Sequence, residues 1–246
     1  MYSTIKTAII QGIQTKPIQV EVDISNGMPA FDMVGQLSGE VREGKERIRT
    51  ALHNIGVILP AKRITINLSP ANVRKNGTGF DLPIAIAILQ SLGVISKEDC
   101  EGKLFIGELG LNGQILPVNG VLPIVSDGMQ ERIKDFVIPK DNEIEASLVK
   151  GANIYAFSNL QEIIDFLNGK PYVKEIYNIE ELIEKPTCGT GRFLCFLFSY
   201  HGCMVMSPFG SLSQENISTS SLGEIPSDRS INPAIQASRP TISGAE

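Results

Sequence analysis

The strongest constraint on the fold is a glycine-rich segment at residues 107–120, which reads GELGLNGQILPVNG. An apolar run, Leu104 to Leu109, leads into it, and a second short strand pattern and a Pro/Asn/Gly exit follow the central glycines. Glycine adopts the positive φ angles of tight turns at little cost, so strand patterns on both sides of such a turn are typical of a β-hairpin. The segment therefore predicts a tight hairpin with a fixed register.

Strand and helix patterns alternate along the first 170 residues. Isoleucine and valine occupy every second position from Ile18 to Ile24, which predicts a half-buried strand. Val41 to Ile55 has a helical period and stops at Gly56, whereas Asp81 to Leu92 is almost wholly apolar and predicts a buried helix. Further strands are predicted at Thr4–Gln11, Ala30–Val34, Arg63–Leu68, Phe136–Ile138 and Ile154–Phe157, and further helices at Leu122–Ile133, Glu143–Lys150 and Leu160–Leu167.

This order of elements predicts the fold class and the domain organisation. Alternating strands and helices favour an α/β fold, and the antiparallel strands at the start make its sheet mixed. We expect one domain at residues 1–170, a linker at 171–186 and a disordered or aberrant tail at 187–246. All 13 lysines precede residue 186, and 11 serines lie in the last 60 residues, so the composition changes sharply there.

Several classes of protein are excluded by composition. The sequence has no apolar run of about 18 residues and no signal-peptide pattern, so we expect no membrane association. Four cysteines without a CxxC pair and only two histidines argue against a zinc site or a histidine triad. The sequence thus predicts a cytoplasmic protein with no cofactor and no metal.

The net charge of −5 hides an uneven distribution. Residues 1–80 carry 10 Lys and Arg against 6 Asp and Glu, whereas the rest of the chain is acidic. Such a basic segment can contact nucleic-acid phosphates or an acidic partner, although a solvated helix face is the plainer interpretation. The residues that we expect to contact DNA or a partner are Arg47, Lys62, Arg63, Arg74 and Lys75. The rival interpretation is that they bridge neighbouring subunits.

Several motifs occur in order along the chain and together resemble a known family. They include VEVDISNGMPAF at residues 20–31, PAKRITINLSPA at 60–71, DLPIA at 81–85 and the hairpin at 107–120. Over about residues 1–170 the sequence resembles the Lon-protease-like N-terminal domain of magnesium-chelatase-like AAA+ ATPases of the ComM type. The resemblance implies a Lon-like, ribosomal-protein-type mixed sheet with packed helices.

The resemblance also implies an ATPase module downstream, and here the sequence departs from the family. Some members act as hexameric DNA helicases in the recombination of incoming DNA, so DNA and other copies of the chain are expected partners. This chain has no GxxxxGK[ST] phosphate loop, and we expect that it is truncated before the module. Gly39 to Lys45 has the spacing GxxxxGK, but Glu46 follows in place of the hydroxyl that would hold magnesium. We therefore expect no ATP binding by this chain.

The residues of the Lon catalytic dyad are also replaced. In the resemblance to the protease, its nucleophilic serine aligns with Gly79 and its catalytic lysine with Leu122. A Ser–Lys dyad needs a hydroxyl and an amine of lowered pKa, and neither side chain is present at these positions. Thr78, Ser69 and Lys75 are nearby substitutes.

Two hypotheses about function follow. The first is a non-catalytic domain of a ComM-type ATPase that binds DNA or a partner; the alternative is a residual hydrolase with a substitute nucleophile. Glu108 and Asp81 are the carboxylates closest to the signature loops, and we expect them to accept hydrogen bonds from turn amides, with Asp81 as a helix N-cap. Whether the chain has catalytic activity depends on what these loops bring together.

Overall fold

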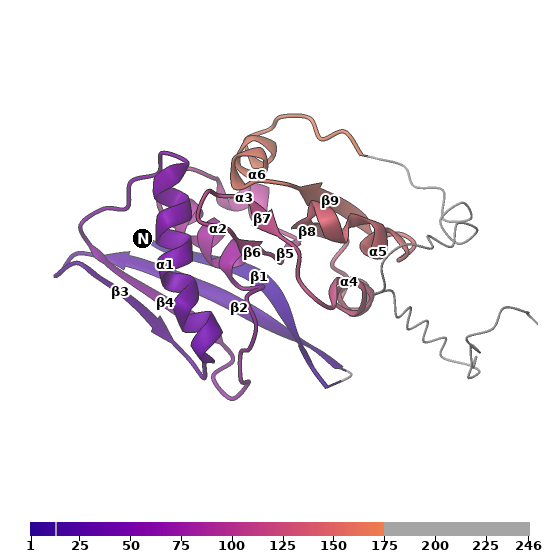
Figure 1. Ribbon diagram of the computed structural model, residues 1–246, viewed down its shortest axis with the longest axis horizontal. Coiled ribbons are helices and arrows are strands. Elements are labelled where there is room, and N and C mark those ends of the chain that lie inside the picture. Colours follow the sequence, from indigo (N-terminus) through magenta and orange to yellow (C-terminus); the bar gives the residue numbers. More distant parts are fainter. Residues whose placement is uncertain (13, 175–246) are drawn as a thin grey trace, which may run out of the picture. The chain divides into compact units, whose positions relative to one another are not determined.

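The computed structural model describes residues 1–12 and 14–174. The tail expected at residues 187–246 and most of the linker expected at 171–186 lie outside these residues. Figure 1 shows helices on both faces of a central sheet. Its elements are β1 (Tyr2–Gln11), β2 (Gln14–Ser25), β3 (Ala30–Val34), α1 (Gly39–Asn54), β4 (Arg63–Ser69), α2 (Asp81–Ser91), α3 (Lys97–Cys100), β5 (Lys103–Phe105), β6 (Glu108–Leu109), β7 (Ile115–Leu116), α4 (Val121–Gln130), β8 (Asp135–Pro139), the 3-10 turn η1 (Lys140–Asn142), α5 (Glu143–Ser147), β9 (Asn153–Phe157) and α6 (Leu160–Leu167).

Seven strands form one mixed sheet in the order β3-β4-β2-β1-β5-β8-β9. β2 runs antiparallel to its neighbours β1 and β4, and the other neighbouring pairs are parallel. The register pairs Thr7 with Ile18 in β1 and β2, and Val22 with Ile66 in β2 and β4. The expectation of an α/β fold with a mixed sheet is therefore confirmed.

One face of the sheet is covered along its whole width. Ile5, Val20 and Ile66 point from their strands to this face, where α1 and α2 pack on them. α2 is buried on every side because residues 81–89 are all inaccessible, which explains its lack of a polar stripe. Under β5, β8 and β9 the same cluster continues through Phe105, Val137 and the apolar side of α6.

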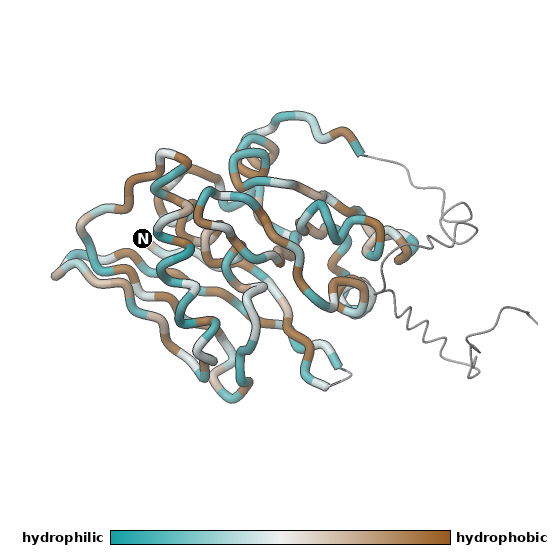
Figure 2. Tube along the Cα trace, viewed as in Figure 1, coloured by the Kyte–Doolittle hydropathy of each residue, from teal (hydrophilic) through white to brown (hydrophobic). Residues whose placement is uncertain are grey.

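The described residues cover the opposite face over only half of the sheet. A second cluster joins Ala8 of β1 and the strands β5, β8 and β9 to α4 and α5. Beyond β1, the same face of β2 and β4 carries polar residues such as Glu21 and Asn67, whose side chains hydrogen-bond at 2.8 Å. Figure 2 shows the corresponding alternation of hydrophilic and hydrophobic residues along these strands.

The predicted elements agree with the structure except at their ends and at one break. The expected strand Leu104–Leu109 divides at Gly107, and only β5 stays in the main sheet. Gly107 donates to the carbonyl of Gly79 and accepts from the amide of Leu82, so its backbone groups bind the loop before α2. β6 and β7 then form the predicted hairpin as a separate two-stranded sheet. The short helix α3 was not predicted.

Candidate functional site

Gly79, the position aligned with the Lon serine, lies in the loop before α2, and Leu122, the position aligned with the Lon lysine, lies in the first turn of α4. Gly79 stands two residues before α2, and a side chain at this position would contact Ile106 at 3.3 Å and Val118 at 3.7 Å. Leu122 is the second residue of α4. Apolar side chains therefore fill the space next to Gly79, and a serine there would face Ile106 and Val118.

The substitute residues are bound elsewhere. The Thr78 hydroxyl donates to the carboxylate of Glu108. Lys75 is fully buried, and its ammonium donates to the carbonyl of Pro70. Ser69 pairs with Gln19 in the register of β4 and β2 and therefore lies on the uncovered face of the sheet. Among the described residues, no hydroxyl contacts the Lys75 amine, so the structure does not assemble the substitute dyad.

Lys75 has a structural position that the sequence did not indicate. Its backbone N–H donates to Gln36 and its carbonyl accepts from Ser38, which ties the loop before α2 to the segment between β3 and α1. Burial lowers the pKa of its ammonium, because the charged form is desolvated. A buried Lys75 cannot bind a phosphate without movement of this loop.

Arg47 and Asp81 form a part-buried ion pair between α1 and α2. Nε of Arg47 lies 2.6 Å from one carboxylate oxygen of Asp81, and Nη2 lies 3.2 Å from the other. The Asp81 side chain is 2% exposed and the Arg47 side chain 21%. Burial raises the pKa of Asp81, and the Arg47 guanidinium opposes this shift. The pair also needs Gly44 of α1, because a side chain there would collide with the Asp81 carboxylate.

Asp81 does accept from a backbone amide of the hairpin, Leu109, at 3.5 Å, in keeping with the expected role. The expectation that it is an N-cap is wrong. Phe80 occupies the N-cap position of α2, and Asp81 is the first helical residue, with its carboxylate held by Arg47 instead. Glu108 accepts from Thr78, a side chain rather than a turn amide.

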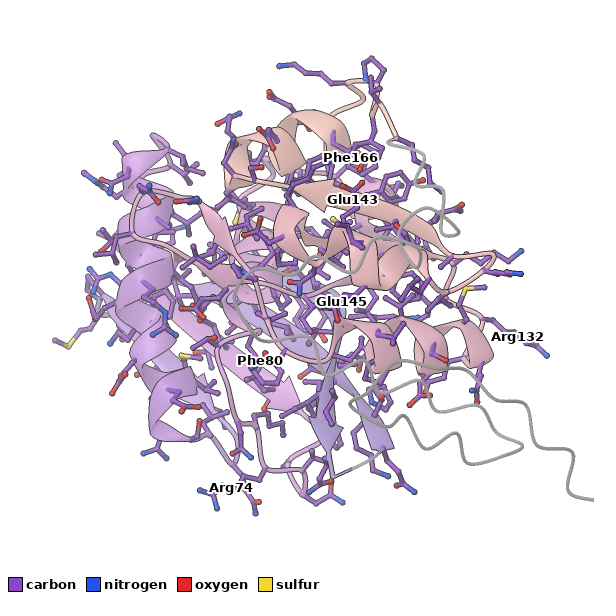
Figure 3. All side chains as sticks on the ribbon, turned by 45° about the vertical axis from the view of Figure 1, so that its right-hand side comes forward. Arg74, Phe80, Arg132, Glu143, Glu145 and Phe166 are labelled. Carbon is purple, nitrogen blue, oxygen red and sulfur yellow. The ribbon has the colours of Figure 1, made fainter. Side chains whose placement is uncertain are left out.

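The five predicted binding residues differ in their exposure to solvent in the structure. Arg47 is bound to Asp81 and Lys75 is buried, so neither presents a free cation. Arg63 is exposed, with its side chain 2.9 Å from Asp32, and Lys62 next to it is half-buried. Arg74 is exposed in the loop after β4, at the lower margin of the view in Figure 3. β4 spans seven residues, so about 20 Å separates its two ends, and the exposed cations form two groups.

A further feature, the contacts of Asn142 and Glu145, was beyond sequence reasoning. Glu145 of α5 accepts from the side-chain amide of Asn142. Burial raises the pKa of Glu145, and the Asn142 hydrogen bond and the backbone amide of Leu122, in the first turn of α4, lower it. The spacing of Asn142 and Glu145 matches a local side-chain pair, but only the fold shows that Asn142 also holds the backbone N–H and carbonyl of Val118, in the loop before α4.

The described residues show neither a metal site nor a membrane span. No group of three or more His, Cys, Asp and Glu among residues 1–12 and 14–174 could hold a metal ion. Within the same part of the chain, every helix is too short or too polar to traverse a bilayer.

Comparison with known proteins gives consistent matches. The model of the family "Subunit ChlI of Mg-chelatase" matches residues 20–142, half of the chain. Competence protein ComM of Haemophilus influenzae is 40% identical over 159 residues, 65% of this chain and 31% of that protein. The protein YifB of Escherichia coli is 38% identical over 168 residues, which are 68% and 33% of the two chains.

A more distant relative carries the protease name. Lon protease 2 of Bacillus subtilis is 26% identical over 163 residues, 63% of this chain and 29% of that protein. In these three comparisons the chain spans about one third of the length of the curated relatives it matches. The residues matched by the family model, 20–142, lie within the mixed α/β domain that the structure describes.

Proposed function

Because this chain belongs to the family of the ChlI subunit of Mg-chelatase, with ComM and YifB as relatives, we propose that residues 1–174 act as a non-catalytic binding domain. The domain binds DNA or a partner on behalf of an ATPase module. The ATP-dependent processing of incoming DNA that the ComM resemblance implies belongs, in this proposal, to a longer protein in the cytoplasm.

The observation that carries the proposal is the surroundings of the two dyad positions. Gly79 faces Ile106 and Val118, and Leu122 brings an apolar side chain to the start of α4. Catalysis by a Ser–Lys dyad requires the hydroxyl and the amine within hydrogen-bond reach. Thr78 and Lys75, the nearest replacements, bind Glu108 and Pro70 instead. These contacts favour a binding role over residual hydrolysis.

A peptidase assay tests the non-catalytic part. We expect the purified chain to leave a fluorescently labelled unfolded protein, such as casein, intact over many hours. Turnover that is lost in Thr78→Ala or Lys75→Met would contradict the proposal and favour the hydrolase. Because Lys75 is buried, circular dichroism must show that the Lys75→Met variant is folded, and Thr78→Ala gives the same information with a smaller risk of unfolding.

The proposed contact with DNA involves fewer residues than the sequence alone suggested. Its cationic candidates are now Lys62, Arg63 and Arg74, because these are the exposed or half-exposed members of the predicted set. Phosphate contacts by so few cations are weak and sequence-independent, and they decrease with salt. No aromatic residue lies beside these three in the sequence, so base stacking is not expected to add affinity.

Fluorescence anisotropy with single-stranded and duplex DNA at low salt tests the proposed DNA binding. The variant Lys62→Glu/Arg63→Glu should lose the salt-sensitive signal. The matched control Lys134→Glu/Lys150→Glu makes the same change of charge at exposed residues outside the predicted set and should retain it. No binding by the unmodified chain, with a change of oligomeric state in the Lys62/Arg63 variant, would favour the rival role of these residues as a bridge between subunits.

A further inference from the structure

The two edges of the sheet differ in how they are protected. At β9 the backbone N–H of Ala156 donates to the hydroxyl of Tyr172 at 3.0 Å. The ring of Tyr172 packs against Tyr155, Phe157 and Phe166, with centroids 5.2–5.9 Å apart. This edge is therefore blocked by the segment after α6, as natural proteins commonly block exposed strands.

At the other edge, the described residues give β3 a neighbour on one side only. Its partner is β4, and Figure 1 shows no described element beyond it. The N–H of Ala30 donates to the carbonyl of Lys62, so Ala30, Asp32 and Val34 direct their backbone groups to β4. By the alternation of a strand, the backbone groups of Phe31 and Met33 point outward. β3 contains neither proline nor lysine, residues that commonly discourage pairing at an edge.

Helix α1 borders this open edge with positive charge. Lys45 lies with its ammonium 5.8 Å from the centre of the Phe31 ring, which places this flank of α1 beside β3. Arg42 and Arg49 stand three residues before and four after Lys45, and therefore on the same flank. We call Arg42, Lys45 and Arg49 the basic flank. The opposite flank is occupied, because Arg47 binds Asp81 and Asn54 donates to the carbonyl of Leu111.

The cations of the basic flank have little internal compensation. Among the described residues, this flank forms a weak ion pair, with Arg49 4.0 Å from the exposed Glu46. Asp32 of β3 is bound to Arg63 on the opposite, uncovered face of the sheet. An added strand at β3 would lie about 4.8 Å further out, with alternate side chains directed to the basic flank. Carboxylates on those side chains would complement it.

We propose that the edge of β3 and the basic flank of α1 bind an extended, acidic peptide segment of a partner protein. The segment adds a strand to the sheet, and its acidic side chains contact Arg42, Lys45 and Arg49. The inference rests on the proposed binding role and names the partner's chemistry. A peptide is favoured over DNA because the outward groups of Phe31 and Met33 alternate as donors and acceptors, which a peptide backbone matches.

The test uses the full chain and a labelled octapeptide that alternates Glu and Val. Anisotropy at low salt should show binding, weakened about tenfold in Arg42→Glu/Arg49→Glu, because two favourable charge contacts become repulsive. The control Lys134→Glu/Lys150→Glu, with the same change of charge at exposed residues remote in sequence, should bind as the unmodified chain does. An octapeptide alternating Lys and Val should not bind.

A second peptide tests the strand pairing without changing the protein. N-methylation of alternate residues of the Glu/Val octapeptide keeps its charge but removes the donors that would face β3, and we expect binding to be lost. Equal binding of the methylated peptide, or of an oligonucleotide in place of the peptide, would overturn the inference. Neither result would affect the non-catalytic role, which would fail only if the chain cleaved an unfolded protein.

Discussion

The two halves of the sheet differ in how many of their faces are covered by apolar side chains. β5, β8 and β9 are parallel and have apolar clusters on both faces, with α6 on one side and α4 and α5 on the other. β2, β3 and β4 have an apolar cluster on one face and hydrogen-bonded polar residues on the other. Parallel strands joined by helices are covered on both faces, whereas a sheet that contains antiparallel strands can leave one face in water.

Because of this difference, we expect structural roles in the half that is covered on both faces and binding roles in the half that is covered on one. In the doubly covered half, Phe136 and Val137 are adjacent and both fully buried, so neither is available to a partner. In the other half, alternate residues remain open, together with the edge of β3 and the basic flank of α1. The surfaces that we propose for binding therefore lie in the half that is covered once.

The comparison predicts the largest loss of stability in the doubly covered half. Phe136→Ala removes a buried ring that packs against Gly128 of α4, and the free energy of unfolding should fall by about 3–5 kcal/mol. Gln19→Ala, at an exposed position on the open face of β2, should change it by less than about 0.5 kcal/mol. Urea denaturation measures both. Similar losses for the two variants would contradict the comparison.

The second prediction contrasts the two faces of the half that is covered once. Asp81→Asn removes the carboxylate of a part-buried pair and leaves Arg47 without its partner, which should cost about 3 kcal/mol. Arg63→Met breaks an exposed pair on the open face and should cost about 0–1 kcal/mol. Thermal unfolding of both variants would test this order. A larger loss for Arg63→Met would mean that the open face is covered in solution.

Cys100 is buried just before β5, where the two halves meet, and it predicts a dependence on pH. Burial raises the pKa of its thiol to about 11 from the ordinary 9.0. The unfolded chain therefore loses this proton first, so the stabilising contribution is complete below pH 9 and disappears as pH rises through 11. At pH 11 the free energy of unfolding should be about 2 kcal/mol lower than below pH 9 because of this thiol.

The variant Cys100→Ala isolates this contribution. We expect the difference in unfolding free energy between the chain and the variant to shrink between pH 9 and 11. Burial lowers the pKa of Lys75, so this residue makes the free energy of unfolding rise with pH. Lys75 is common to both proteins, and its contribution cancels in the difference. A difference that is constant with pH would show that the thiol is accessible.

The smallest predicted effect concerns the protected edge. Tyr172→Phe keeps the aromatic packing but removes the acceptor for the Ala156 amide, which should cost about 1 kcal/mol. Hydrogen exchange at Ala156 should become faster, while exchange at Val137 in the neighbouring strand should not change. Unaltered exchange at Ala156 would mean that the edge of β9 is blocked without the hydroxyl.

Local patterns predicted the elements well where one physical rule dominates. The alternation from Ile18 to Ile24 predicted a half-buried strand, and β2 buries those residues. The apolar run Asp81–Leu92 predicted a buried helix, which α2 is. The break at Gly107 escaped prediction because its cause is a pair of hydrogen bonds to Gly79 and Leu82, about 25 residues earlier in the chain.

The candidate site was predictable in part. The loss of the dyad follows from the side chains of Gly79 and Leu122 alone, since glycine and leucine offer neither nucleophile nor base. The five cations were chosen by their charge, and charge does not report burial. Lys75 is inaccessible and Arg47 is paired because distant segments surround them, so their positive charge gave no indication of their contacts.

The sequence by itself determined the order of strands and helices, the hairpin at residues 107–120 and the family to which the chain belongs. These follow from side-chain periodicity, turn chemistry and motifs, which are local properties. The tertiary structure alone decided which cations reach solvent, which edge is open and which flank of α1 borders it. Those features depend on contacts between residues far apart in the chain, such as Lys45 with Phe31 and Arg47 with Asp81.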